Sequence, residues 1–365
     1  CYEKFSIPAF TPAILNIILI LSVLFFSESF SEPVYALAWG LIFAGIVQLI
    51  FVLYPLIKMG LFPKINFNKN HPGIKKIKKL MIPVIFGSSV TQVNLIFDTI
   101  IASFLITGSI SWLYMSDRFI ELPLALFGIS IATVLLPKLS EYYNKKDNKS
   151  YNATINWGLK LGILISIPTC IGLILLSEPI LVTLLQYREF SANDVSMTSL
   201  SLIAFAFGLP GMIGAKILIT NYYSRKDTSY PVRAAVIAVI TNFVMNIVFV
   251  IYLTSIKFEG VHVGLALATS VSAYINFFLL FKNAIKTKIL IIDKSIIQIL
   301  AKTILASIIM TLFILYFDLN ADSWVNLELV DRVSKLFMII SLAAIVYFIL
   351  LYALKISPKK IKLEL

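Results

Sequence analysis

Long apolar runs constrain the fold of this chain more than any other feature of its sequence. The hydrocarbon core of a bilayer is about 30 Å thick, which about 20 apolar residues span as an α-helix. Runs of that length follow one another along most of the 365 residues. We expect membrane spans at 9–27, 34–57, 81–106, 110–136, 158–177, 199–222, 231–254, 261–281, 297–317 and 333–354. The sequence therefore predicts an all-α, polytopic membrane protein with about ten transmembrane helices.

The composition and the pattern of the runs exclude the main alternatives. Hydrophobic residues make up 59% of the chain and charged residues 14%, whereas soluble domains have about 45–50% and about 25%. A soluble fold cannot bury that much apolar surface. Runs such as 14–26 also lack the alternation of apolar and polar residues that membrane β-strands show. We expect Pro12, Pro83 and Pro231 to lie at helix starts, where the missing N–H of proline is harmless.

The positive charges indicate how the chain lies in the membrane. The net charge is +12, and Lys and Arg gather in every second connection between the runs, as the positive-inside rule requires of cytoplasmic loops. With an even number of spans, both ends of the chain are then cytoplasmic. Nothing in the sequence resembles a basic groove with interleaved base-stacking aromatics, so we expect no nucleic-acid partner. Lys160 and Lys216 are expected near helix ends, where long side chains snorkel to the interface.

Two connections contain more than a turn. Residues 58–80 form a basic cytoplasmic loop whose Ile74–Leu80 part either lies along the anionic membrane face or is simply solvated. Residues 178–197 combine several leucines with Tyr187 and Phe190, so we expect a short interfacial helix on the outer face. Two roles stay open for this helix: it serves as a gate element, or it only packs against the other helices.

Ionisable residues inside the expected spans are few, and each is a functional hypothesis because a charge in hydrocarbon costs about 2.5–3.5 kcal/mol on insertion scales. In span 110–136, Asp117, Arg118 and Glu121 are three or four residues apart and form one polar stripe. Arginine suits a pyrophosphate ligand because its planar fork donates two hydrogen bonds and stays charged. The stripe is therefore either an anion-binding site or an Arg–acid cluster that only holds helices together.

A second set of polar residues lies on three other spans. Asp98 is well inside the span 81–106, Asn242 and Asn246 are one helical turn apart, and Thr269 is on the following span. Such side chains either bridge helices by hydrogen bonds or coordinate a cation through their oxygen atoms.

The sequence offers no catalytic constellation. Only two cysteines occur, Cys1 and Cys170, and His71 and His262 stand alone in connections. No HExxH, GxSxG or P-loop motif and no Cys/His cluster supplies a nucleophile or a metal site. We expect neither an enzyme nor a metal site nor a disulfide framework.

Several stretches of the chain resemble the MurJ/MviN family of lipid II flippases, which belongs to the MOP exporter superfamily. The matching stretches are 7–16 (IPAFTPAILN), 36–40 (ALAWG), 91–104 (TQVNLIFDTIIASF), 108–114 (GSISWLY), 117–123 (DRFIELP), 128–139 and 222–227 (YYSRKD). They occur in the family's order and at its spacing through most of the chain. The resemblance is therefore more specific than any single motif.

The resemblance implies a MOP-exporter-like fold of fourteen helices, in which two six-helix lobes surround a central cavity and two added helices form a groove for a long lipid tail. The expected division is 1–57 as the last two helices of the N-terminal lobe, 58–80 as the basic loop, 81–288 as the C-terminal lobe and 289–365 as the added pair with a basic tail. The chain begins with Cys1 instead of Met. The first four helices are thus expected to be missing, and this segment alone is not expected to transport.

The resemblance also implies a function in peptidoglycan synthesis. Family members carry lipid II, the undecaprenyl-pyrophosphate-linked precursor, from the inner to the outer face of the bacterial cytoplasmic membrane by alternating access. Lipid II and membrane lipids are then the expected partners of a monomer. Arg118 corresponds to the second-lobe arginine that holds the substrate diphosphate, with Asp117 and Glu121 beside it.

A coupling ion is implied less firmly. Asp98, Asn242 and Thr269 fall where some members of the family bind Na⁺, but this chain has Asn246 where those members have a second acid. We expect no cofactor other than Na⁺ or H⁺ as the coupling ion.

Three alternatives stay open. The first is an exporter of another lipid-linked oligosaccharide or of a small molecule with the same fold. The second is a membrane-embedded transferase, although the sequence shows no carboxylate pair at a loop that faces a donor substrate. The third is a non-functional fragment.

Overall fold

The computed structural model describes residues 6–60, 77, 81 and 92–356, and all regular structure in these ranges is helical. Within them, nine helices are long and apolar enough to cross a membrane. The expected span 81–106 is described only over its later part, where residues 92–103 are helical. The predicted all-α, polytopic membrane fold is confirmed. The chain divides into two units, Cys1–Lys79 and Leu80–Leu365.

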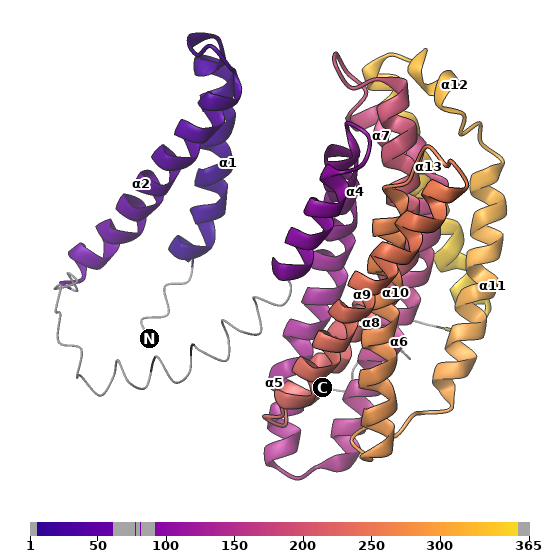
Figure 1. The fold of residues 1–365 in the computed structure, drawn as a ribbon. Coiled ribbons are helices and arrows are strands. Elements are labelled where there is room, and N and C mark those ends of the chain that lie inside the picture. Colours follow the sequence, from indigo (N-terminus) through magenta and orange to yellow (C-terminus); the bar gives the residue numbers. More distant parts are fainter. Residues whose placement is uncertain (1–5, 61–76, 78–80, 82–91, 357–365) are drawn as a thin grey trace. The chain divides into compact units, whose positions relative to one another are not determined.

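The described part of the first unit is a helical hairpin (Figure 1), in which α1 (Ser6–Phe26) and α2 (Val34–Lys58) are joined through the short helix η1 (Ser27–Ser29). Small buried residues at every fourth position of α2, among them Gly40, form the contact. A Cβ added at Gly40 would collide with the Ser22 hydroxyl on α1, because small residues let helix backbones approach closely.

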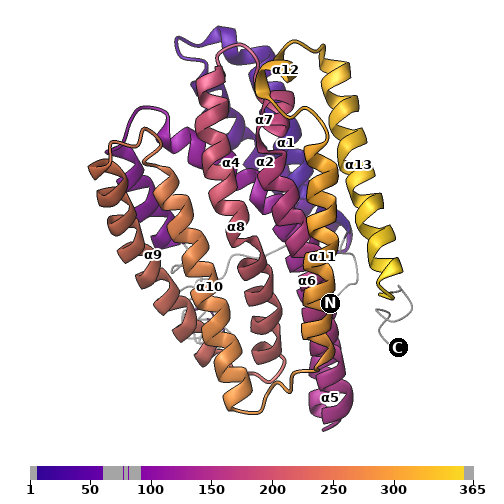
Figure 2. The ribbon, with the colours of Figure 1, turned by 90° about the vertical axis from the view of Figure 1, so that its right-hand side faces the viewer.

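The second unit is a bundle of helices that cross or cap the membrane-spanning layer (Figures 1 and 2). Its described elements are α4 (Ser109–Pro123), η2 (Leu124–Ile129), α5 (Ser130–Asn144), α6 (Asn148–Leu175), α7 (Ser177–Leu184), α8 (Ala192–Tyr223), α9 (Ser229–Ser255), α10 (Val263–Lys286), α11 (Ser295–Leu315), α12 (Ala321–Val325) and α13 (Leu329–Ala353). Helix α8 is the most buried and packs against α4, α6 and α10, while α11 and α13 lie on the α6 side (Figure 2).

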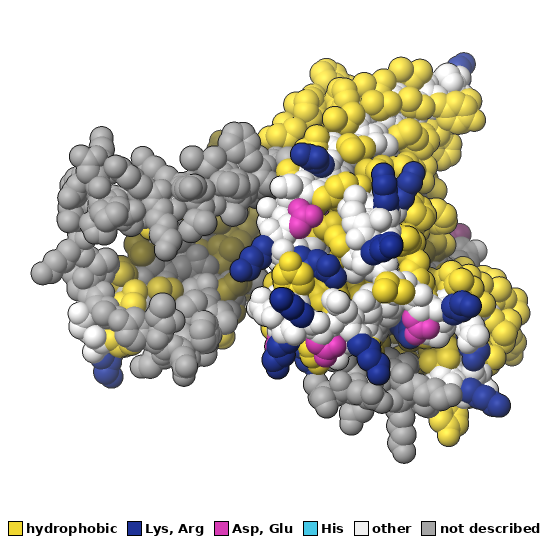
Figure 3. All heavy atoms as spheres, turned by 90° about the horizontal axis from the view of Figure 1, so that it is seen from below, with side chains coloured by type: hydrophobic (Ala, Val, Ile, Leu, Met, Phe, Trp, Pro, Cys, Tyr) yellow, Lys and Arg dark blue, Asp and Glu magenta, His cyan; other side chains and the backbone are white. Residues whose placement is uncertain are grey.

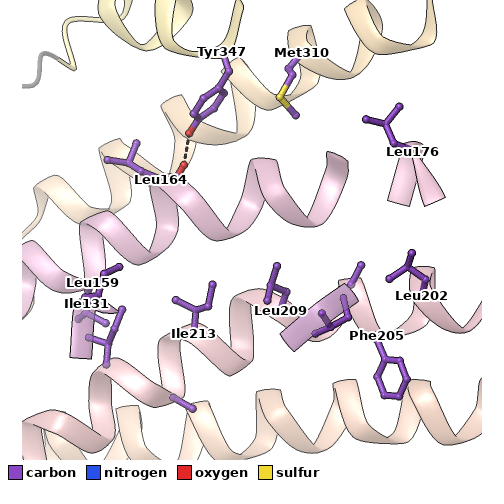
Figure 4. Packing of buried hydrophobic residues seen from close by; sticks show 14 of the residues in the cluster. Ile131, Leu159, Leu164, Leu176, Leu202, Phe205, Leu209, Ile213, Met310 and Tyr347 are labelled. Atoms are coloured by element: carbon purple, nitrogen blue, oxygen red, sulfur yellow. Dashed lines mark hydrogen bonds between the residues drawn. The ribbon is translucent and has the colours of Figure 1, made fainter. Parts of the chain in front are cut away.

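Apolar side chains of α8 and its neighbours form the core of this unit (Figure 4). Leu209 and Ile213 of α8 are fully buried beneath α6. Helix α13 is tied to α6 by one internal hydrogen bond, in which the Tyr347 hydroxyl donates to the Leu164 carbonyl at 2.7 Å. In contrast, the outward faces are rich in exposed large hydrophobic residues, as a lipid-facing surface requires.

Several helix boundaries differ from the sequence prediction. Elements α4, η2 and α5 form one continuous helix over 109–144, so span 110–136 was predicted eight residues too short at its end. Helix α6 begins at Asn148, ten residues before the predicted start of span 158–177. Its first turns are polar, and a search for apolar runs cannot see a helix that continues beyond the hydrocarbon layer.

The predictions for the prolines and for residues 178–197 are confirmed in part and wrong in part. Pro231 lies in the first turn of α9 as predicted, but Pro12 lies inside α1, and Pro83 is outside the described residues. The short helix predicted within 178–197 exists as α7. Its residues Pro179–Thr183 are buried, so α7 packs against the bundle. The basic loop 58–80 lies almost entirely outside the described residues.

Candidate functional site

The predicted polar stripe lies on α4, and two of its three members, Arg118 and Glu121, are paired. Nη1 of Arg118 donates to Oε2 of Glu121 at 2.6 Å, and each side chain is 53% exposed. The pairing confirms that residues three apart share a helix face. Asp117 is half-buried and forms no ion pair with any described residue. The guanidinium is thus held by a single contact with one carboxylate.

One residue of the stripe was missed by the sequence analysis. The guanidinium carbon of Arg118 lies 4.6 Å from the ring centroid of Tyr114, one turn earlier on α4. Arginine stacks in this way on aromatic faces. The i, i+4 spacing of the two residues was the available signal, but aromatic residues are so common in membrane spans that the spacing alone did not single out Tyr114.

The N-terminal part of α4 is anchored to α8, which fixes the stripe in place. Nε1 of the buried Trp112 donates to Oδ1 of Asp194 at 2.7 Å, and Asp194 also caps the first turn of α8 together with Ser191. Gly108, just before α4, has φ +102°, and a Cβ there would meet the Trp112 ring. After Pro123, the π-helical turn η2 interrupts the α-helix. Such π-bulges are frequent near functional sites.

The second predicted set of polar residues is brought together by three helices. Nδ2 of Asn246 on α9 donates to Oδ1 of Asp98 at 2.6 Å and to Oδ1 of Asn242 at 2.9 Å. Asn242 contacts the Thr269 hydroxyl of α10 at 3.1 Å. Asn94, which the analysis did not name, donates to Oδ2 of Asp98 at 3.2 Å. The four predicted residues therefore form one contiguous cluster.

The donor set of this cluster fits a monovalent cation. The cluster offers oxygens from one carboxylate, two amides and one hydroxyl, which are the ligands that hard cations take. Oδ1 of Asn246 is buried and has no hydrogen-bond partner among the described residues. With its amide turned over, Asn242 donates to Asp98 and Asn94 and its oxygen accepts from Thr269. Among the described residues, no group of three His, Cys, Asp or Glu side chains forms a metal site.

Two further basic side chains do not behave as predicted. Lys160 does not snorkel from a helix end. It lies in the middle of α6, and its Nζ pairs at 2.6 Å with Oδ2 of Asp293, in the connection before α11. The Lys160 ammonium holds the pKa of the Asp293 carboxyl below its usual range. Lys216 is an exposed residue of α8 and, like Lys160, lies more than one turn from the helix end.

The environment of His262 was only partly predicted. It lies in the connection before α10, as predicted, but its side chain is fully buried and contacts other residues instead of standing alone. Its Nε2 lies 3.0 Å from the Met197 carbonyl, and its ring lies 4.9 Å from the ring of Trp112. Burial lowers the pKa of His262. His71 is outside the described residues.

An apolar cavity of about 440 Å³ lies between α6, α11 and α13. Side chains from each helix line it, including Pro168 of α6, Met310 of α11 and Phe348 of α13.

Lys and Arg side chains gather at one end of the second unit (Figure 3). The connections α5–α6, α8–α9 and α10–α11 meet at that end (Figures 1 and 2).

Comparisons with known proteins agree with the resemblance found in the sequence. A family model described as lipid II flippase MurJ matches residues 1–351. The probable lipid II flippase MurJ of Vibrio cholerae is 38% identical over 359 residues, which cover 98% of this chain and 67% of that protein. The corresponding protein of Haemophilus influenzae is 39% identical over 350 residues, covering 94% of this chain and 67% of its own.

A further relative and a solved structure extend the match. The lipid II flippase MurJ of Burkholderia cenocepacia is 33% identical over 359 residues, covering 97% of this chain and 68% of that protein. A structure of lipid II flippase MurJ in an inward closed conformation superposes with a TM-score of 0.75 at 29% identity, covering 95% of this chain and 67% of that one. This chain therefore belongs to the MurJ family of lipid II flippases.

Proposed function

We propose that this chain takes part in moving lipid II from the inner to the outer face of the bacterial cytoplasmic membrane by alternating access. Family membership supports the substrate, and the single observation that carries the assignment to a site is the half-open guanidinium of Arg118 on α4. A guanidinium has five N–H donors, and its contact with Glu121 uses one of them. A diphosphate can therefore bind to the remaining donors as a bidentate ligand.

The acids beside Arg118 give this site a means of release. Glu121 is already in contact with the guanidinium, and Asp117 is the adjacent residue. Both carboxylates compete with the diphosphate for Arg118, so the headgroup is exchanged and not trapped. In our proposal, the diphosphate first binds the free donors of Arg118 and then displaces Glu121, and Glu121 returns to Arg118 when the substrate leaves.

The apolar cavity between α6, α11 and α13 is the proposed seat of part of the polyprenyl tail. Its lining is almost entirely apolar, which suits a hydrocarbon chain and not a sugar. This assignment agrees with the expectation that residues 289–365 contribute a groove for the lipid tail. The tail then stays in an apolar environment while the headgroup crosses.

A monovalent cation is the proposed coupling ion, and it binds at the cluster of Asp98, Asn242, Asn246 and Thr269. The unpartnered oxygen of Asn246 supports this assignment, and the single carboxylate matches a single positive charge. Na⁺ and H⁺ are the two candidates. Na⁺ binding predicts stabilisation of the purified chain by NaCl but not by KCl, whereas H⁺ coupling predicts a pH dependence without any Na⁺ dependence.

The orientation, assembly and chemistry of the chain complete the proposal. The basic end of the second unit faces the cytoplasm, because anionic lipid and the positive-inside rule favour Lys and Arg there. The chain acts as a monomer and forms no covalent intermediate. Labelling of single cysteines introduced at Lys146 or Lys226 by a membrane-impermeant maleimide in intact cells tests the orientation, and labelling from outside would refute it.

A segment exchange tests the transport function. In cells that depend on the Burkholderia cenocepacia relative, this chain replaces the 68% of that protein that it matches. We expect lipid II at the outer face, where an added lipid II-cleaving enzyme releases its headgroup. A chimera that is inserted in the membrane but exposes no lipid II, while the parent protein does, would contradict the proposal. Exposure of a different lipid-linked oligosaccharide would instead favour the alternative exporter.

A further inference from the structure

Tyr114, Arg118 and Glu121 lie on one stripe of α4, and Arg118 contacts each of the other two side chains. The Arg118 guanidinium carbon is 4.6 Å from the Tyr114 ring centroid on the preceding turn. On the following turn, Glu121 contacts the same guanidinium at 2.6 Å. Arg118 is therefore drawn toward an aromatic ring on one side and a carboxylate on the other.

The contact with Glu121 involves one nitrogen and one oxygen. Arginine and carboxylate commonly close both arms of the fork in two parallel hydrogen bonds, and an i, i+3 pair on an exposed helix face has the freedom to do so. Here only Nη1 and Oε2 meet among the described atoms. The Tyr114 ring contacts the same guanidinium, and the electron-rich face of such a ring attracts a cation in competition with a carboxylate.

We infer that Tyr114 is a positioning residue that keeps half of the Arg118 fork open for the diphosphate. This inference rests on the proposed function of Arg118. Without the ring, the guanidinium closes onto Glu121 in a bidentate pair and its charge is neutralised within α4. The diphosphate then has to break two hydrogen bonds instead of one before it binds.

A double substitution distinguishes the positioning of Arg118 by Tyr114 from a mere stabilisation of α4. Equilibrium binding is measured with the purified chain in nanodiscs, using lipid II and undecaprenyl diphosphate that carries no sugar. Tyr114→Leu replaces the ring by a smaller apolar side chain, Tyr114→Phe keeps the ring, and Tyr114→Leu/Glu121→Gln also removes the competing charge. Tyr252→Leu is the matched control, because Tyr252 is 59% exposed on α9 against 53% for Tyr114.

A cation–π contact of about 1–2 kcal/mol corresponds to an affinity change of about 5- to 30-fold. We expect Tyr114→Leu to weaken both ligands by that factor, and Tyr114→Phe and Tyr252→Leu to bind within about twofold of the wild type. Glu121→Gln in the Tyr114→Leu background should restore most of the loss, since no carboxylate then closes the fork. A residue that merely stabilises α4 would show no such rescue.

Several results of this experiment would contradict the inference, and each of them has a different meaning. A wild-type chain that binds neither ligand overturns the proposed function and, with it, the role of Tyr114. A wild-type chain that binds both ligands while Tyr114→Leu also binds normally overturns only the inference. A loss confined to lipid II would show that the ring contacts the sugars, and a loss without rescue by Glu121→Gln would show that it supports the helix. Either result also overturns the positioning role.

Discussion

Arg118 and Glu121 meet at a single contact of 2.6 Å, three residues apart on α4, with half of each side chain exposed. The same long helix carries a second pair of the same length, Lys145 with Glu141, near its other end. The two pairs differ in their surroundings. Only the first has an aromatic ring stacked against the cation, and only the first is proposed to exchange its carboxylate for a ligand.

The competition between Glu121 and the diphosphate predicts a gain of affinity on neutralising the acid. Glu121→Gln should bind undecaprenyl diphosphate a few-fold more tightly than the wild type at low salt, because an exposed ion pair contributes about 0.2–1 kcal/mol. Glu141→Gln, which breaks the other pair, should leave the affinity unchanged. Titration of both variants in nanodiscs checks this, and weaker binding by Glu121→Gln would show that Glu121 does not compete with the ligand.

The cation cluster predicts ion-specific stability. If the proposed coupling ion is Na⁺, NaCl should raise the melting temperature of the wild-type chain relative to KCl, since a ligand that binds only the folded state stabilises it. Asp98→Asn removes the only charge of the cluster and should abolish the difference. Asp331→Asn, at an exposed position on α13, is the control and should retain it. Identical curves in both salts for the wild type would leave H⁺ as the proposed ion.

The Lys160–Asp293 pair predicts a pH-dependent contribution to stability. Because Lys160 depresses the pKa of Asp293, the pair stabilises the folded state fully above the ordinary carboxyl pKa of about 3.9. This contribution is lost as the pH falls through the lower folded-state pKa. Asp293→Asn should therefore lower the melting temperature at pH 7, and the gap to the wild type should close at strongly acidic pH. A gap of constant size would contradict a charge effect.

Close packing of α8 against α10 predicts a sharp difference between two glycines. A Cβ at Gly208 would lie 2.7 Å from the Ser270 Cα, whereas one at Gly172 would meet nothing within 4 Å. Gly208→Ala should cost about 1–3 kcal/mol as overpacking, and Gly172→Ala should be neutral or slightly stabilising because alanine favours helix. Thermal unfolding in detergent distinguishes them. Equal melting temperatures would show that α8 and α10 can separate without cost.

Local sequence patterns were enough to predict most of the membrane helices and the contact between Arg118 and Glu121. Apolar runs predicted the membrane helices because each run alone must satisfy its backbone inside hydrocarbon. The spacing of Arg118 and Glu121 predicted their contact, since residues three apart on a helix are neighbours. Asp98 and Asn246 come from different helices, and their grouping was predicted from the family resemblance and not from spacing.

Long-range and cooperative features were beyond the sequence analysis. Lys160 and Asp293 are 133 residues apart, so no local pattern reveals their pairing. Asn148 starts α6 because the polar first turns of that helix extend beyond the hydrocarbon layer, where hydropathy gives no signal. Tyr114 was missed because aromatic residues are common in membrane spans, so the sequence alone does not indicate which of them contacts an arginine. In each case the decisive contact is made in three dimensions.

The affinity of the purified chain for lipid II, measured for Arg118→Ala beside the wild type, tests the central claim most directly. Arg233→Ala, at an exposed position in the first turn of α9, is the control for loss of one positive charge. Hydrogen bonds to charged groups contribute about 1.5–3 kcal/mol, so Arg118→Ala should bind about 10- to 150-fold more weakly while Arg233→Ala binds normally. Wild-type affinity in a folded Arg118→Ala protein would contradict the account.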